Sequence, residues 1–348
     1  MLSTLNLRAL GWALLASALL AASVVAGSRN LQNFDGALAA YLFATLFAAF
    51  GIVYRYAVWL QRPPTKLYWR AGWRLLFSRR FPAYIAELAR RLVDELALQR
   101  FIWRRSPKRG LAHVLLAWGC LSAFAITIPL TFGWVHFTLK AGTIDVYQAH
   151  LLGFHAFDFP LGGFVALNLF HALNWSSVLV LLGVFGFLRR RITDAGQIAT
   201  QTFEMDLMPL VLLVLISVTG LGLTWDYELM QGRAHAFMAI SHAITVILFL
   251  LWLPFGKFFH VFQRPAQLGV ALYQREGEAG AQAVCPHTGE AFASRMHVED
   301  LKQVTAELGY DYRLAGGGSH LDLSPQGKRA ALAKAHLAAR NESGAYFG

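Results

Sequence analysis

Residues 241–265 read SHAITVILFLLWLPFGKFFHVFQRP, a largely apolar run with one histidine near each end. Such a run approaches the roughly 20 apolar residues that a helix needs to cross a bilayer core of about 30 Å. The whole chain has 348 residues, of which 56% are hydrophobic and 15% are charged, whereas charged residues make up about a quarter of an ordinary soluble domain. The sequence therefore predicts an all-α integral membrane protein.

Five more apolar runs precede this one, and together they predict a six-span helical bundle. The first run contains Arg8 near its start, but it is longer than the apolar core of a signal peptide, which has about 7–15 residues. We therefore expect it to be a membrane span like the others. The predicted spans are 7–26, 36–60, 110–134, 162–188, 205–225 and 236–260.

The cations are concentrated in particular loops, which gives the chain an orientation. The loop 61–109 is dense in arginine and lysine, and Arg189, Arg190 and Arg191 follow the fourth span. The loops 27–35, 135–161 and 226–235 are poorer in cations. The positive-inside rule then places the basic loop and both termini in the cytoplasm, at a bacterial inner membrane. The net charge of +11 therefore indicates topology and no nucleic-acid partner.

The alternation of apolar and polar segments divides the chain into four parts. These are two N-terminal spans (1–60), the basic cytoplasmic loop (61–109), a four-span region (110–265) and a short soluble C-terminal tail (266–348). Within the loop, residues 84–105 have leucines at helical spacing, which predicts an amphipathic helix. This helix would lie on the anionic leaflet or dock a partner. In the tail we expect helices at 298–309 and from Pro325 to about 340.

Histidine is the candidate ligand for any redox centre in this chain. The two cysteines, Cys120 and Cys285, are too few for a four-cysteine iron–sulfur site. Ionisable groups inside a membrane are costly and usually functional. Spans three, four and six contain histidines but no acidic residue, whereas a proton relay would be expected to include buried carboxylates. The pattern therefore favours ligation of a cofactor such as haem.

Helix rise pairs these histidines by depth. The 18 residues from His242 to His260 complete five turns, so both lie on one helix face about 27 Å apart along the axis. On span three, His113 lies near the cytoplasmic edge, as His260 does on span six. The two are predicted to meet across an inner haem.

The outer side offers a second pair. His171 lies 18 residues before Arg189, which places it about 27 Å above the cytoplasmic edge. His242 lies at a similar depth on span six. The sequence therefore predicts that His171 and His242 ligate an outer haem, so two haems are expected, and one would remain if this site were absent.

Other readings of the histidines stay open. A lone histidine in a membrane helix can simply hydrogen-bond across a helix contact. His136, His150, His155 and His235 lie in or beside outer loops and are reserve ligands. In the tail, Cys285 and His287 of AVCPHTGEAF (283–292) look like half of a zinc or rubredoxin-type knuckle. We expect the tail to dock a soluble redox subunit rather than to hold a metal.

One pattern resembles a known family. His242–x₁₁–Pro254–Phe255–x₄–His260, followed by a basic residue and a proline, resembles the last span of the membrane cytochrome b (gamma) subunit of respiratory nitrate reductase. It also resembles related membrane subunits of heterodisulfide-reductase-like and sulfite-reductase-linked complexes. The resemblance covers about residues 105–265.

The resemblance implies b-type haems, each held by two histidines, that exchange electrons between membrane quinone and a cytoplasmic iron–sulfur partner. It carries His113 and His260 over to the inner haem, and His242 to the outer one. The family's second outer ligand follows the first histidine by ten residues, at a position that is Ala123 here. His171 is our substitute because of its depth.

We therefore expect a dihaem cytochrome b that serves as the electron-transfer subunit of a quinone-linked oxidoreductase complex, with no catalytic residue of its own. Two alternatives belong to other classes. A proton- or solute-coupled transporter would use the histidines as relays. A haem-free anchor would recruit a soluble complex through the basic loop and the tail.

Overall fold

The structure, a computed structural model, describes residues 5–314 and 317–343 and forms two compact units. The membrane unit comprises Met1–Val58 and Arg91–Gln263. The loop–tail unit comprises Trp59–Arg90 and Arg264–Gly348. The first part of the basic loop therefore folds together with the tail, although residues 91–263, the larger part of the membrane unit, separate them in the sequence.

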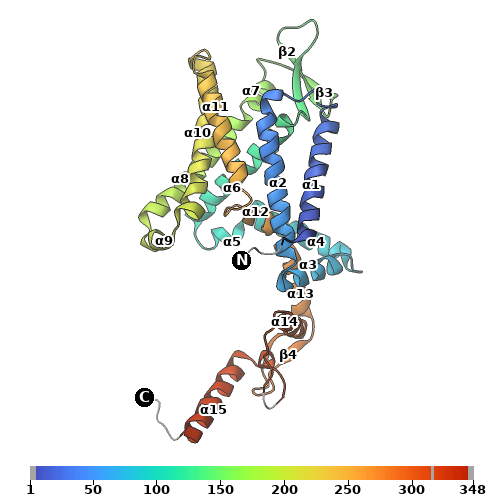
Figure 1. Cartoon of the computed structure of the whole chain (residues 1–348), viewed down its shortest axis with the longest axis vertical. Helices are drawn as coiled ribbons and strands as arrows, with labels where there is room; N and C mark the ends of the chain where they lie inside the picture. The colour runs from blue at the N-terminus through green and yellow to red at the C-terminus, as the bar shows by residue number, and fades with distance from the viewer. Residues whose placement is uncertain (1–4, 315–316, 344–348) are drawn as a thin grey trace. The chain divides into compact units, whose positions relative to one another are not determined.

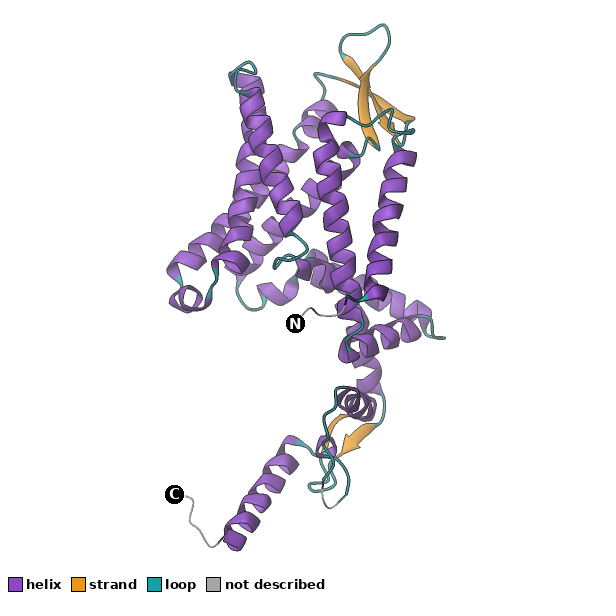
Figure 2. Cartoon of the chain, in the orientation of Figure 1, coloured by secondary structure: helices purple, strands orange, loops and turns teal. Residues whose placement is uncertain are grey.

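Six helices in the described part of the chain are long and apolar enough to cross a membrane, which confirms the predicted six-span helical bundle. They stand side by side in the membrane unit (Figure 1), and helix is the main secondary structure (Figure 2). The chain is accordingly a multi-pass membrane protein. The helices are α1 (Leu7–Gly27), α2 (Ala39–Leu60), α6 (Pro107–Thr131), α8 (Ala172–Thr193), α10 (Met208–Leu229) and α11 (His235–Trp252).

Glycines let α6 and α8 approach until their backbones are in contact. A Cβ at Gly183 of α8 would lie 2.6 Å from the amide nitrogen of Leu116 and 2.8 Å from the carbonyl oxygen of Ala112. On α6, a Cβ at Gly119 would lie 2.8 Å from the amide nitrogen of Val180. Lipid removes the hydrophobic driving force between helices, so close van der Waals packing at small residues holds them together.

An apolar cluster forms where α8, α10 and α11 meet, with α10 packed against both of the others. Phe187 of α8 and Phe258 and Phe262, which follow α11, pack against this cluster. It is the main buried core of the membrane unit. Its fully buried members are Val180, Val184, Leu210, Leu212, Leu213, Phe249 and Leu253.

The expected loop at 135–161 is folded into a three-stranded antiparallel sheet in the order β1-β2-β3. Aromatic and β-branched residues recur along these strands, which favours extended structure. A short helix, α7 (Phe164–Phe170), then leads to α8. The strands are β1 (Val135–Leu139), β2 (Val146–Leu151) and β3 (Phe154–Pro160).

The connection between α1 and α2 packs against the start of this sheet. Gly133 has a φ of +68°, and a Cβ there would lie 2.3 Å from the Asn33 carbonyl oxygen, so only glycine fits. Trp134 Nε1 donates a 3.1 Å hydrogen bond to the Ser23 carbonyl. Arg29 donates to the Gly153 carbonyl in the β2–β3 turn.

Three histidines form a row across the sheet, one on each strand. His136 pairs with His150, and His150 pairs with His155. The first two rings are stacked with centroids 4.8 Å apart, and the next two centroids are 5.9 Å apart. At the end of the row His155 Nε2 lies 2.6 Å from Asp158 Oδ1, and Lys140 Nζ lies 2.8 Å from Asp158 Oδ2.

The loop–tail unit is built on a close contact between α3 and α13. A Cβ at Gly72 of α3 would lie 3.1 Å from Gly269 Cα of α13. The rings of Tyr68 and Tyr273 meet edge to face with centroids 5.0 Å apart. The helices of this unit are α3 (Pro63–Leu76), α4 (Phe81–Arg91), α13 (Gln267–Ala279), α14 (Arg295–Glu307) and α15 (Pro325–Ser343), with a hairpin of β4 (Gln282–Val284) and β5 (Ala291–Ser294).

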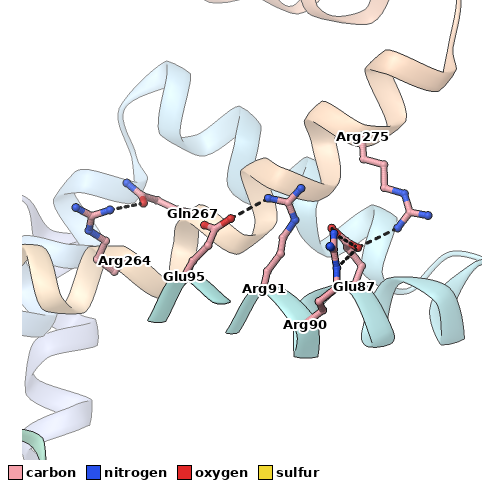
Figure 3. Close-up of polar contacts among 7 residues, drawn as sticks. All are labelled: Glu87, Arg90, Arg91, Glu95, Arg264, Gln267 and Arg275. Atoms are coloured by element: carbon pink, nitrogen blue, oxygen red, sulfur yellow. Dashed lines mark hydrogen bonds and ion pairs between the residues drawn. The ribbon is translucent and has the colours of Figure 1, made fainter. Parts of the chain in front are cut away.

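An ion pair and a hydrogen bond connect α4 to α13. Glu87 of α4 pairs with Arg90 of its own helix at 3.0 Å and with Arg275 of α13 at 3.5 Å (Figure 3). Tyr84, which is buried, donates a 2.5 Å hydrogen bond to Glu276. In the tail, α14 overlaps the helix expected at 298–309, and α15 begins at Pro325 as predicted.

Gly183→Val should destabilise the membrane unit, because the new side chain would meet the backbone of α6. Overpacking of this kind typically costs about 1–3 kcal/mol. Thermal unfolding of the purified protein in detergent measures the effect. Gly11→Val in α1 is the matched control, because no atom lies within 4 Å of a Cβ there. Equal midpoints for both variants would contradict the close contact of α6 and α8.

The sheet should lose stability in mild acid. Burial lowers the pKa of His136 below its ordinary value of 6.5, and the charges of His150 and Arg29 lower it further, against a smaller opposing effect of a hydrogen bond to Gly133. The unfolded chain therefore binds a proton here more readily than the folded one, so stability falls as the pH drops below about 6.5. Hydrogen exchange of the strand amides at pH 7.5 and 5.5, corrected for intrinsic rates, measures this loss.

Asp158 contributes stability that does not change between pH 7.5 and 5.5, so it cannot account for this loss. Hydrogen bonds from Lys140, His155 and Gln148 hold its pKa well below the ordinary value of 3.8, so its contribution is present above about pH 4 and is lost only in stronger acid. His136→Phe should therefore abolish the change between pH 7.5 and 5.5. An unaltered pH dependence in that variant would show that His136 is not the titrating group.

Candidate functional site

The four histidines predicted as ligands all belong to the membrane unit. His113 lies near the start of α6, and His242 lies within α11. His171 stands at the junction of α7 and α8, where it caps both helices. His260 is on a separate short helix, α12 (Phe259–Gln263).

The prediction of one continuous helix over 236–260 is wrong. α11 ends at Trp252, and the chain passes through Pro254 before α12 begins at Phe259. Proline lacks an N–H and its ring clashes with the preceding turn, which ends a helix at this point. The helix-rise argument that placed His242 and His260 on one face therefore fails.

Span four is also interrupted, because α7 ends and α8 begins at His171. The predicted span 162–188 is thus two helices. α8 itself is unbroken from Ala172 to Thr193, so the helix-rise estimate between His171 and Arg189 still applies. His171 stands at the end of α8 that is attached to the sheet.

The turn between α11 and α12, which leads to His260, is held by charged side chains from two other elements. Arg55 of α2 donates a 2.7 Å hydrogen bond to the Pro254 carbonyl, and its guanidinium lies 4.3 Å from the centre of the Phe259 ring. Lys257 Nζ lies 2.6 Å from Asp206 Oδ1. Sequence reasoning missed Arg55, although an arginine inside a membrane span was a signal that could have found it.

In each of the four imidazoles Nδ1 lies within hydrogen-bonding distance of an oxygen atom. Two of these oxygens are main-chain carbonyls three or four residues earlier, and two belong to side chains on other elements. The distances are 2.6 Å from His113 to Gln99 Oε1, 2.7 Å from His260 to the Lys257 carbonyl, 2.9 Å from His171 to the Leu167 carbonyl and 3.0 Å from His242 to Thr219 Oγ1.

These acceptors determine which ring nitrogen carries the proton. A carbonyl or amide oxygen can only accept, so in the neutral ring Nδ1 is the donor and Nε2 has the lone pair. Thr219 donates its own proton to the Leu215 carbonyl at 2.6 Å, so it accepts from His242. Histidines that bind a metal usually have this arrangement, with the other ring N–H donated to an oxygen.

Two of the three histidines of the sheet have the opposite arrangement, whereas Nδ1 of His136 is buried without a hydrogen-bond partner among the described residues. His150 Nε2 lies 2.9 Å from Thr138 Oγ1, and His155 Nε2 lies 2.6 Å from Asp158 Oδ1. The nitrogen best placed to reach a large planar cofactor is thus already bonded in these reserve candidates. The hydrogen-bond pattern separates the four predicted ligands from these two loop histidines.

Two residues that sequence reasoning missed position these rings. Gln99 is buried and has a φ of +52°, which interrupts the amphipathic helix expected at 84–105 and aims its amide at His113. Gly220 lies beside His242, where a Cβ would come within 3.2 Å of the ring carbon Cε1. The sequence does not predict the left-handed conformation of Gln99, because glutamine rarely adopts it.

Each predicted pair borders shared neighbours. On the inner side, the Phe187 ring lies 6.0 Å from the His113 ring, and Phe187 packs against the same apolar cluster as Phe258 and Phe262, which flank His260.

On the outer side, His242 bonds Thr219 of α10. One turn after His171, Asn174 Oδ1 accepts a 3.1 Å hydrogen bond from Thr224 of the same helix. About a turn and a half of α10 separates Thr219 from Thr224, so His242 and the turn of α8 that follows His171 contact one stretch of α10.

The remaining candidates have other surroundings. His235 Nδ1 lies 3.9 Å from Asp226 Oδ2, and Asp226 is fully buried. Cys285 is buried in the loop–tail unit, while His287 is exposed. Within residues 5–314 and 317–343, no group of three or more His, Cys, Asp and Glu side chains is placed to hold a metal ion.

Comparison of the chain with known proteins does not identify a family. No family model, no curated protein and no solved structure matches the chain.

Proposed function

We propose that this chain is a cytochrome b subunit that passes electrons between membrane quinone and a cytoplasmic iron–sulfur partner. One observation carries the proposal: four histidines of the membrane unit each have Nδ1 bonded to an oxygen, which leaves Nε2 as the basic atom of the neutral ring. The membrane segments contain almost no acidic residues, so these nitrogens are better suited to bind a metal than to relay protons.

His113 and His260 are the proposed ligands of an inner haem b, and His171 and His242 of an outer one. When bound, haem supplies a reversible one-electron carrier whose potential depends on its ligands and their hydrogen bonds. The protein holds the ligand rings in place through Gln99, Thr219 and the turn fixed by Arg55. Gly220 leaves space beside His242.

Quinone is proposed to react on the side of the membrane that carries the sheet. Its oxidation and reduction release or take up protons, and the histidine row that ends at Asp158 offers imidazoles to exchange them, with the ionised carboxylate orienting His155. Lys140 and His155 keep this carboxylate ionised, since they hold its pKa below its ordinary range. Lys140 follows β1, Asp145 precedes β2 and His150 lies within β2, so all three belong to the same hairpin.

The opposite side is the proposed cytoplasmic face of a bacterial inner membrane, with both termini there. The cations of the loop 61–109 favour this orientation. The loop–tail unit, made of part of this loop and the tail, is the proposed docking surface for the iron–sulfur partner. The direction of electron flow would depend on the reduction potential of the partner.

A transporter with a histidine relay is the second candidate, and one observation favours it. Asp226 near the end of α10 is fully buried, and its Oδ2 has no hydrogen-bond partner among the described residues. The His235 ring lies 3.9 Å away. A buried carboxylate beside an imidazole is a known feature of proton paths.

Purified protein should contain two haem b groups per chain in a pyridine haemochrome assay. His113→Ala and His260→Ala should each remove one haem, and the double variant should lose no more than either, because both act on one site. His171→Ala and His242→Ala should remove the other. His336→Ala, at an exposed tail position, is the control and should retain both.

Other haem counts would change the assignment. If the wild type contains only one haem and His171→Ala retains it, the outer site is eliminated. A colourless protein, expressed with adequate haem supply, would overturn the cytochrome proposal and leave the transporter and the haem-free anchor. Asp226→Asn should abolish proton-coupled uptake in the transporter and have no such effect in an anchor.

Gln99 should tune the inner haem as a positioning residue. Gln99→Gly suits the left-handed backbone but removes the acceptor for His113, so that ligand becomes less basic. We expect weaker haem retention, by about 10-fold or more, and a more positive midpoint potential. Gln99→Glu keeps an acceptor and should shift the potential the other way. Redox titration followed by optical absorbance measures both, and identical potentials would remove Gln99 from this role.

A further inference from the structure

A small pocket lies between α3 and α14, and both helices belong to the loop–tail unit. Its volume is about 210 Å³, which is smaller than the roughly 300–1,000 Å³ of pockets for drug-sized ligands. Ala71 of α3 and Val304 of α14 are buried and belong to its lining. A space of this size is suited to a small polar molecule or ion, because a water molecule in the liquid occupies about 30 Å³.

Opposite charges line the two sides of the pocket. α3 contributes Lys66, Arg70 and Arg74, and α14 contributes Asp300 and Glu307. The three cations are spaced by four residues, slightly more than one helical turn, so they form a row along one face of α3. A ligand in the pocket therefore meets hydrogen-bond donors on α3 and carboxylate oxygens on α14.

The two carboxylates already have partners within the unit. Glu307 Oε2 lies 3.7 Å from Lys66 Nζ, and the two side chains are 38% and 39% exposed, so this ion pair is weak. Asp300 Oδ2 accepts a 2.5 Å hydrogen bond from the Tyr273 hydroxyl of α13. Burial and the bond to Asp300 raise the pKa of Tyr273 above its ordinary value of 10.0, so this phenol stays a donor. Among the described residues, no hydrogen bond reaches the second oxygen of Asp300, Oδ1.

The two arginines are the charges of the pocket that have no counter-charge. Among the residues that the structure describes, neither Arg70 nor Arg74 forms an ion pair. Four residues separate them, which places their Cα atoms about 6 Å apart along the helix axis. Guanidinium groups at this spacing can bind the oxygens of one tetrahedral oxyanion through charge-assisted hydrogen bonds.

We propose that this pocket binds inorganic phosphate in the form HPO₄²⁻. Arg70 and Arg74 donate hydrogen bonds to its charged oxygens, and Asp300 Oδ1 accepts the proton of its P–OH group. The carboxylate selects this ion, because an ionised carboxylate can only accept a hydrogen bond. Sulfate has no proton to offer, so it would be repelled by Asp300. The proposal involves none of the histidines and does not depend on a cofactor.

The same selection distinguishes free phosphate from phosphate esters. A monoester has a second pKa of about 6, so it is almost entirely unprotonated at pH 7.5. The diester of a phospholipid head group has no P–OH at this pH. Both would place oxygen lone pairs against Asp300, and we therefore expect free phosphate to bind more tightly than an ester.

Isothermal titration calorimetry on the full chain in detergent tests the site. Sodium phosphate, sodium sulfate and glycerol 3-phosphate are titrated separately at pH 7.5, in a phosphate-free buffer of constant ionic strength. Phosphate should bind at one site with an affinity at least tenfold above that of either other anion. Equal affinity for phosphate and sulfate, tighter binding of the ester, or no binding of phosphate would overturn the proposal.

Arginine variants locate the site. Arg70→Gln/Arg74→Gln should weaken phosphate binding by at least tenfold. Arg329→Gln/Lys334→Gln removes the same charge at exposed positions of α15, and this matched control should bind phosphate as the wild type does. Equal losses in both variants would show that binding follows the overall charge of the protein, which would overturn the assignment to this pocket.

Asp300→Asn tests the selectivity. The new amide can donate to an anion, and it retains an oxygen for Tyr273, so sulfate should bind as tightly as phosphate. Asp311→Asn, at an exposed position paired with Arg313, is the control and should keep the preference for phosphate. A tenfold preference that persists in Asp300→Asn would remove the carboxylate from the proposed site.

A further variant leaves the bond between Asp300 and Tyr273 intact. Glu307→Gln removes the partner of Lys66, so this cation becomes available to the anion. Phosphate should then bind at least threefold more tightly. Unchanged or weaker binding would contradict a phosphate ion placed between α3 and α14.

Discussion

An imidazole inside a membrane must find a hydrogen-bond partner for its N–H, because lipid offers none, and this constraint governs the rest of the structure. In all four candidate ligands the partner is an oxygen next to Nδ1. Two of these oxygens require unusual local structure: the left-handed backbone at Gln99 and the hydroxyl of Thr219 that is already committed to Leu215. These contacts link the rings to the helices and turns around them.

Composition was enough to predict the bundle. Apolar length depends on bilayer thickness alone, and the six predicted spans correspond to six observed helices. The approximate place of His113 and His242 also followed from the sequence, because both lie within single unbroken helices. The identity of any cofactor stays a prediction, because the sequence specifies the ligand type without the partner across the bundle.

Features that depend on tertiary contacts could not be read from the pattern. Periodicity suggested a continuous helix through Pro254, whereas Arg55 from α2 holds the chain in a turn there. The sheet between α6 and α7 was hidden because its strands are short and its inward residues mix histidine with aromatics. The pairing of α3 with α13 joins segments that no local signal relates.

That pairing has a consequence for biosynthesis. α3 leaves the ribosome early, but Gly269 and Tyr273, which cover its Gly72 face, are made only after most of the membrane unit. During translation the Gly72 face of α3 therefore waits uncovered, and synthesis of the later spans must precede closure of the loop–tail unit. The sequence thus imposes an order of assembly. The helices made after the six spans complete the loop–tail unit, which starts with α3.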